Sequence, residues 1–346
     1  MGKDTSTAPN GFIRTMKKLY HPLGFKKGYN FYLWFIFAGA LFGFSLSRFM
    51  YLNYDVHYRE GSAPGEWYWQ HAGLRRVGLI LHLATILPAG LLVVLQFTPI
   101  IRYKALLFHR LNGYFVVLLL LLSEAGALML AKHSFGGEFE TQTWTGFLVI
   151  ITTVSVILAY YNIKRLQIEQ HRAWMLRTWF YAASIITLRI VMIISAQIVG
   201  PAGGFYQAVR CDKIKFLYAD RAIPGVEQDY PQCFSSAPNA TIDGYTVVPA
   251  TFSGNSMQIG SALGVTFGTA GWLATTLHAI GVEIYLHLTP RETERLRKLS
   301  YERQLERGMR NPGDAGLTAQ RLGDTDAWHP IEEESVGKGT QADVVG

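Results

Sequence analysis

Three ionisable residues fall inside long apolar stretches, where a charged group is costly and usually has a partner or a role. Glu124 lies in LLLLLSEAGALML, Arg189 in SIITLRIVMII and His82 in GLILHLATIL. In helices, a rise of 1.5 Å per residue puts Glu124 and Arg189 at similar depth, roughly 15–18 Å from one end of a bundle, with His82 one or two turns away. We therefore expect Glu124 and Arg189 to form an ion pair. The pair is either a structural lock between helices or, with His82, a site for a proton, an ion or a polar substrate.

A second polar layer is expected near the inner boundary of the bundle. It consists of His109, Arg110, His171, Arg172, His278 and Glu283. Imidazoles on neighbouring helices can supply axial ligands to a haem iron, and arginines can bind the propionates. The pattern predicts haem b held by His109, His171 and His278, with Arg110 and Arg172 at the propionates and Glu283 as a hydrogen-bond acceptor for a ligand. The same residues could hold a metal ion or an anionic head group, or could be interfacial side chains that snorkel to the surface.

The stretches that carry these residues are predicted to be transmembrane helices. Of the 346 residues, 49% are hydrophobic and 16% are charged. A bilayer core of about 30 Å needs about 20 helical residues. Six stretches are long enough: 31–49, 77–98, 113–131, 145–161, 178–199 and 258–286. The sequence predicts an all-α integral membrane bundle of about six transmembrane helices over residues 31–287, and Gly260, Gly264 and Gly268 predict a close packing face on the last one.

The placement of basic residues predicts the orientation. Most of the 32 Lys and Arg residues lie in the segments 1–30, 99–112, 162–177 and 288–346. The positive-inside rule puts these segments, and both termini, in the cytosol. The net charge of +7 is then explained by contact with anionic lipid, and no nucleic-acid motif is present. Residues 1–30 form a basic lead-in, and 288–346 form a charged, mostly disordered tail that begins with a basic run of helical character.

The connection 200–257 is predicted to face the lumen or the outside. It contains both cysteines, Cys211 and Cys233, and an N-glycosylation pattern that begins at Asn239. Disulfides and N-glycans form on the same side of the membrane, so the two signals support each other. We expect a Cys211–Cys233 disulfide, a glycan on Asn239, and a eukaryotic secretory or plasma membrane as the location.

Four short motifs resemble a known family. They are Gln96-Phe97, His109-Arg110-x-x-Gly113, His171-Arg172-x-Trp174-Met175-x-Arg177 and Leu188-Arg189. The chain resembles, over roughly residues 75–290, a family of uncharacterised multi-pass membrane proteins of unknown function that occurs in bacteria and filamentous fungi. The long sequon-bearing connection looks like that of the fungal members. The resemblance implies a helical membrane fold and no established activity. The chain is more distantly similar to small di-haem cytochromes, although its histidines are spread unevenly between the two faces.

Three functions follow as hypotheses. The first is a transmembrane redox protein with haem b at His109, His171 and His278, which would need an electron donor. The second is a proton-coupled transporter that uses His82, Glu124 and Arg189. The third is a non-redox membrane enzyme that acts on a lipophilic biosynthetic intermediate. Gly-rich phosphate loops, CxxC and HExxH motifs are absent from the sequence.

Overall fold

The computed structural model describes residues 11–221, 226–234 and 244–330. The chain divides into two compact units. Unit 1 is Met1–Thr153 with Trp179–Ile280, and unit 2 is Val154–Thr178 with Gly281–Gly346. Three long helices contribute residues to both: α8 (Phe139–Lys164), α9 (Ile168–Ala202) and α13 (Ser256–His287). The units are described in turn.

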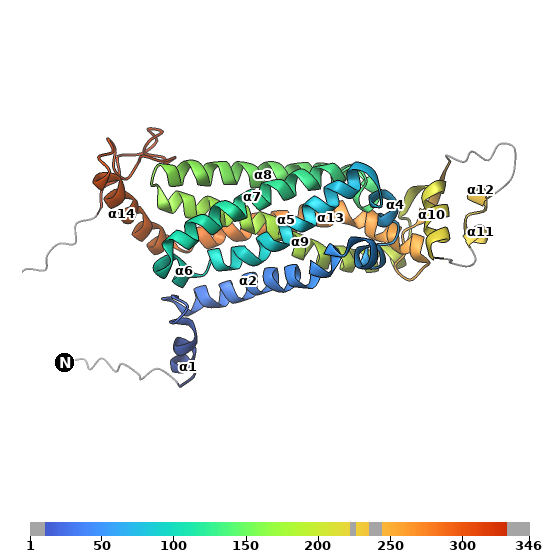
Figure 1. Ribbon diagram of the computed structural model, residues 1–346, viewed down its shortest axis with the longest axis horizontal. Helices are drawn as coiled ribbons and strands as arrows, with labels where there is room; N and C mark the ends of the chain where they lie inside the picture. The colour runs from blue at the N-terminus through green and yellow to red at the C-terminus, as the bar shows by residue number, and fades with distance from the viewer. Residues whose placement is uncertain (1–10, 222–225, 235–243, 331–346) are drawn as a thin grey trace, which may run out of the picture. The chain divides into compact units, whose positions relative to one another are not determined.

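Long apolar helices form the body of unit 1, as the sequence predicts (Figure 1). Besides α8, α9 and α13 they are α2 (Gly28–Arg48), α5 (Gly73–Gln96) and α7 (Leu106–Leu130). In the described part of the chain, five helical segments are long and apolar enough to cross a membrane: Gly28–Leu52, Gly73–Gln96, Leu106–Leu130, Phe139–Lys164 and Ile168–Ala202. The all-α membrane fold is confirmed. The sixth predicted span lies within α13, a 32-residue helix whose many Gly, Ala and Thr residues lower its hydropathy and keep it out of the five.

Glycines allow the closest helix contacts in unit 1. A Cβ added to Gly126 of α7 would lie 2.5 Å from the carbonyl oxygen of Gly78 on α5, so only glycine fits there. On α13, a Cβ at Gly260 would lie 2.6 Å from the Pro64 carbonyl oxygen, and one at Gly268 would lie 2.7 Å from the Thr141 nitrogen. The small-residue face predicted on the last long helix is therefore a packing face.

Shorter elements join these helices. They are α1 (Gly11–Tyr20), η1 (Phe49–Leu52), η2 (Tyr54–Tyr58), α3 (Arg59–Gly61), α4 (Glu66–Gln70), α6 (Pro99–Lys104), η3 (Ser134–Gly137), β1 (Tyr206–Arg210), α10 (Cys211–Arg221), α11 (Val226–Asp229), α12 (Pro231–Phe234) and β2 (Tyr245–Pro249). We call the described residues of 49–72, 131–138 and 203–255 the cap. They gather at one end of unit 1, where α4 and α10 are labelled in Figure 1.

The cap has its own small core. Strands β1 and β2 pair antiparallel, with Tyr206 opposite Pro249. The sulfurs of Cys211 and Cys233 lie 2.02 Å apart, which confirms the predicted disulfide. Both cysteines are buried with Ile214 in an apolar cluster. Asn239, the predicted glycosylation site, lies outside the described residues.

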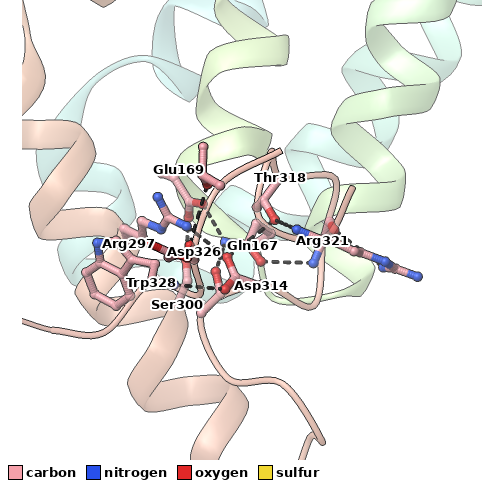
Figure 2. A network of polar contacts seen from close by, with 12 residues as sticks. Gln167, Glu169, Arg297, Ser300, Asp314, Thr318, Arg321, Asp326 and Trp328 are labelled. Carbon is pink, nitrogen blue, oxygen red and sulfur yellow. Dashed lines mark hydrogen bonds and ion pairs between the residues drawn. The ribbon is translucent and has the colours of Figure 1, made fainter. Parts of the chain in front are cut away.

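Unit 2 holds a folded part of the tail. Helix α14 (Pro290–Glu306) confirms the predicted helical run, but residues 307–330, expected to be disordered, fold back over it (Figure 2). The fully buried amide of Gln167 explains this, because it donates to the Gly313 carbonyl at 2.7 Å and accepts from Gln304 at 3.0 Å. Arg297 and Asp314 add an ion pair at 2.8 Å. Buried polar groups that satisfy one another hold this polar segment in place.

Candidate functional site

The predicted ion pair between Glu124 and Arg189 is wrong. The Glu124 carboxylate instead accepts hydrogen bonds from the hydroxyls of Thr152 and Thr153 on α8, the latter at 2.7 Å. His82 also has another partner, since its Nδ1 lies 2.9 Å from the Ser123 hydroxyl. The depth of the two residues along their helices shows that each charge is costly to bury. It does not show which way a side chain points around the helix axis. Glu124 points to α8, and Arg189 does not.

Arg189 lies against aromatic rings. Its guanidinium carbon is 4.8 Å from the ring centre of Phe135 in η3 and 5.4 Å from that of Phe267 on α13. These two rings stack on each other with centres 4.0 Å apart. A guanidinium over aromatic faces is stabilised by the ring quadrupoles, which replace part of its lost hydration. Arg189 is therefore held in place without a carboxylate.

Glu66, at the start of α4, is a carboxyl group whose charge acts on Arg189. Gly65, with φ of 85°, turns the chain into this helix and directs Glu66 inward, where it is only 4% exposed. The backbone N–H of Phe135 donates to Glu66 Oε1 at 3.0 Å, and Gln70 Nε2 donates to Oε2 at 3.1 Å. The hydroxyl of Tyr58 donates in turn to the Gln70 side-chain oxygen. Glu66 thus sits in an ordered polar pocket of the cap.

Lys213 of α10 brings a second cation to this pocket. Its side chain is 6% exposed and lies against Gly65, where an added Cβ would be 2.9 Å from Nζ. Burial raises the pKa of the Glu66 carboxyl, while the charge of Lys213, the Phe135 N–H, the charge of Arg189 and Gln70 oppose the rise. Burial lowers the pKa of Lys213, against the charge of Glu66. Both shifts favour the neutral forms, so the two groups are brought toward a common pKa range, as in acid–base sites.

We call Tyr58, Glu66, Gln70, Arg189 and Lys213 the Glu66 cluster. Within the described residues, neither Lys213 nor Arg189 forms an ion pair with a carboxylate. Two basic side chains and one carboxyl group therefore share a buried environment, so the cluster holds more basic than acidic groups. Sequence analysis found only Arg189. Glu66 stands in the aromatic run EWYWQ, which looks interfacial, and Lys213 stands in a connection, so nothing in their local sequence indicates burial.

His278 and His171, two of the predicted haem ligands, have separate hydrogen-bond partners. Both ring nitrogens of His278 are occupied, Nδ1 at 2.7 Å from the Phe180 carbonyl and Nε2 at 2.8 Å from the Thr187 hydroxyl, so His278 does not fit as an iron ligand. His171 places Nδ1 2.9 Å from the Ala159 carbonyl, which leaves its Nε2 for other partners. His109 is in unit 1 and His171 in unit 2.

The residues predicted to surround a haem have other contacts. Glu283 forms an ion pair with Arg177 at 2.6 Å, Arg172 donates to the Tyr285 hydroxyl at 3.3 Å, and Arg110 is exposed. Across the residues that the structure describes, no group of three His, Cys, Asp or Glu side chains is placed to hold a metal ion. Haem binding through His109 and His171 stays a prediction.

Comparison with known proteins agrees with the resemblance. Residues 79–210 match the family described as "Predicted membrane protein (DUF2306)". The chain is also 25% identical over 312 residues to "Ava biosynthesis cluster protein G" of Aspergillus versicolor, covering 76% of this chain and 90% of that protein. No solved structure matches. Arg189 falls within the family match, whereas Glu66 and Lys213 fall outside it. Residues 79–210 of this chain are thus similar to the DUF2306 family of predicted membrane proteins.

Proposed function

We propose that this chain is an integral membrane enzyme of small-molecule biosynthesis that performs acid–base chemistry on a lipophilic intermediate with an anionic or enolisable group. The observation that carries the proposal is the Glu66 cluster, in which the charges of Lys213 and Arg189 act on a buried carboxyl group and neither base forms an ion pair among the described residues. The name of the fungal relative, "Ava biosynthesis cluster protein G", supports a role in small-molecule biosynthesis.

Arg189 and Lys213 supply the binding of negative charge. A charge-assisted hydrogen bond to a carboxylate or enolate is stronger than a neutral one, and arginine can form two such bonds in parallel. The stacked rings of Phe135 and Phe267 offer an apolar wall beside the guanidinium. A planar, conjugated anion suits these contacts better than a compact, strongly hydrated one.

Glu66 and Lys213 supply the proton transfer. In the proposed step, the Glu66 carboxylate takes a proton from a C–H or O–H acid of the substrate, and the Lys213 ammonium returns one elsewhere on the same molecule. The substrate is isomerised or cyclised, no oxidant is consumed, and a proton passes from Glu66 back to Lys213 to restore the site. The raised pKa of Glu66 and the lowered pKa of Lys213 make proton exchange between the two groups easier than between a free carboxyl group and a free amine.

The proposed location is a secretory or plasma membrane of a eukaryotic cell. The disulfide between Cys211 and Cys233 supports an oxidising compartment for the cap. A glycan on Asn239, removed by Asn239→Gln, would test the orientation, and a cap that is modified by reagents added to the cytosolic side would contradict it.

Deletion of the gene in its native host, with comparison of lipophilic metabolites, tests the function. We expect an intermediate to accumulate in cells, and wild type and Glu60→Gln (an exposed cap carboxylate) to restore the product. Glu66→Gln should fail to restore it although the protein is present in the membrane. Full restoration by Glu66→Gln would refute acid–base catalysis. Accumulation of the finished product inside cells would instead favour transport, and a Soret band in the purified protein would favour the haem hypothesis.

A further inference from the structure

A crevice inside unit 1 lies among α2, α5 and α9. Its walls are apolar and include Ile86 of α5 and Ala183 and Ile185 of α9. Gly90 of α5 faces Ser45 of α2, and a Cβ there would collide with the Ser45 hydroxyl oxygen. The crevice is therefore built at a helix crossing where small residues leave room.

One wall of the crevice carries an unsatisfied donor. Trp179 is 5% exposed and lines the crevice, and its indole nitrogen has no hydrogen-bond partner among the described residues. A buried donor without an acceptor costs about 1–3 kcal/mol. Such a group is retained at low cost when a ligand supplies the acceptor.

Basic residues stand one helical turn beyond the crevice, toward the cap. On α9, Arg189 follows the crevice residue Ile185 by four positions, and on α2, Arg48 follows Ser45 by three. Helix α5 runs in the opposite direction, so there His82 precedes Ile86 by four positions. Residues three or four apart share a helix face. The charge of Arg48 acts on Arg189 and that of Arg189 on His82, so basic groups from all three helices stand at the same end of the crevice.

Helix α2 closes the crevice loosely. Only 6% of the residues in the most apolar 18-residue stretch of Gly28–Leu52 are buried, against 22–39% in the corresponding stretches of the other four candidate membrane spans. A helix with so little buried surface loses little packing when it moves away from α5 and α9. The crevice can then open sideways to the lipid, which is where a lipophilic molecule is concentrated.

We infer that this crevice binds the apolar body of an amphipathic organic acid that enters from the bilayer beside α2. Its anionic group lies at Arg48, His82 and Arg189, and an acceptor oxygen on its body meets the Trp179 indole N–H. Ten residues separate Trp179 from Arg189, so the ligand spans roughly 15 Å. The inference rests on the proposed function, since Arg189 is common to both sites, and it names the substrate class as a long acid rather than a compact one.

Photo-labelling of the full chain in lipid nanodiscs tests the site. The probes are a diazirine-bearing dodecanoic acid and the corresponding dodecanol, with mass spectrometry of the cross-linked peptides. We expect the acid to label peptides of α2, α5 and α9, and excess unlabelled dodecanoic acid to reduce this labelling more than tenfold while dodecanol does not. Labelling spread over all lipid-facing helices, or equal competition by the alcohol, would overturn the inference.

Variants separate the site from general lipid contact. Ala183→Leu fills the crevice and should lower labelling by the acid at least fivefold, whereas Ala84→Leu on the exposed face of α5 should leave it unchanged. Arg189→Gln should lower labelling by the acid about tenfold, to the level of the alcohol, which corresponds to about 1.4 kcal/mol. The competition in wild-type protein decides the outcome if Ala183→Leu does not fold.

Glu66→Gln distinguishes this inference from the proposed function. It leaves the crevice residues in place and removes a negative charge that acts on Arg189, so labelling by the acid should be retained or strengthened. Intact labelling together with full metabolite restoration by Glu66→Gln would refute the proposed enzyme and keep the binding site. A metabolite profile that depends on Glu66 without specific labelling would refute the binding site alone.

Discussion

The electrostatic coupling between Glu66 and Lys213 can be measured directly. The perturbation is a double-mutant cycle of Glu66→Gln and Lys213→Met, which remove the two charges at nearly constant side-chain volume. Both groups are almost fully buried, and each acts on the charge of the other. Each single variant leaves one of the two groups without the charge of the other, and the double variant removes both charges.

The expected magnitude follows from Coulomb's law. Two unit charges about 5–6 Å apart attract by about 3 kcal/mol at an effective dielectric constant of roughly 20. We therefore expect a coupling energy of up to about 3 kcal/mol at a pH at which both groups are charged. The double variant should be at least as stable as wild type, because replacement of buried charges by uncharged groups of similar size is often neutral or stabilising by about 1–4 kcal/mol.

The coupling should depend on pH in one direction. Burial raises the pKa of Glu66, so its contribution to folded stability is present below its ordinary pKa and is lost as the pH rises through the raised value. As the pH falls through that raised pKa, Glu66 becomes neutral and its attraction for Lys213 disappears. The destabilisation of Lys213→Met relative to the double variant should disappear with it.

Thermal unfolding in detergent, followed by intrinsic tryptophan fluorescence over a series of pH values, measures the cycle. A free-energy difference of 1 kcal/mol corresponds to roughly 2–4 °C in Tm for a protein of this order of size. Glu60→Gln serves as the control, since Glu60 is an exposed carboxylate of the same cap. A coupling energy under about 0.5 kcal/mol at every pH of the series, or one that does not fall toward low pH, would refute the description of this pocket.

Three further predictions follow from named contacts. Glu124→Leu should not rescue the folded yield of Arg189→Leu, because Glu124 is hydrogen-bonded to threonines of α8. Recovery of the yield in the double variant would instead support an ion pair between Glu124 and Arg189. Replacement of Cys211 and Cys233 by serine should lower the free energy of unfolding by about 3 kcal/mol, since the disulfide closes a loop of 22 residues. The Tm of the variant should equal that of reduced wild-type protein, and an unchanged Tm would contradict the prediction. Gln167→Ala should expose the chain after α14 to trypsin at least tenfold faster, since it leaves several buried polar groups unpaired, and equal cleavage rates would disprove the folded tail.

Some features of the site were within reach of the sequence. Arg189 was found because an arginine among apolar residues is rare enough to demand an explanation. The cysteine pair was found because only two cysteines exist, both on one predicted connection. The crevice residues were out of reach, because Ala183 and Gly90 look like any other small residues until two helices cross there.

The partner of each buried polar group depends on the tertiary structure. Depth along a helix comes from counting residues, but the direction of a side chain around the axis comes only from packing, and that is why Glu124 binds Thr153 and not Arg189. Glu66 is buried because α4, η3 and α10 close around it, and these come from distant parts of the chain. The sequence alone determined that this protein is a helical membrane protein with an arginine in its bundle, because length and hydropathy are local properties. Which charges meet in the cap is a non-local property, and only the folded structure decided it.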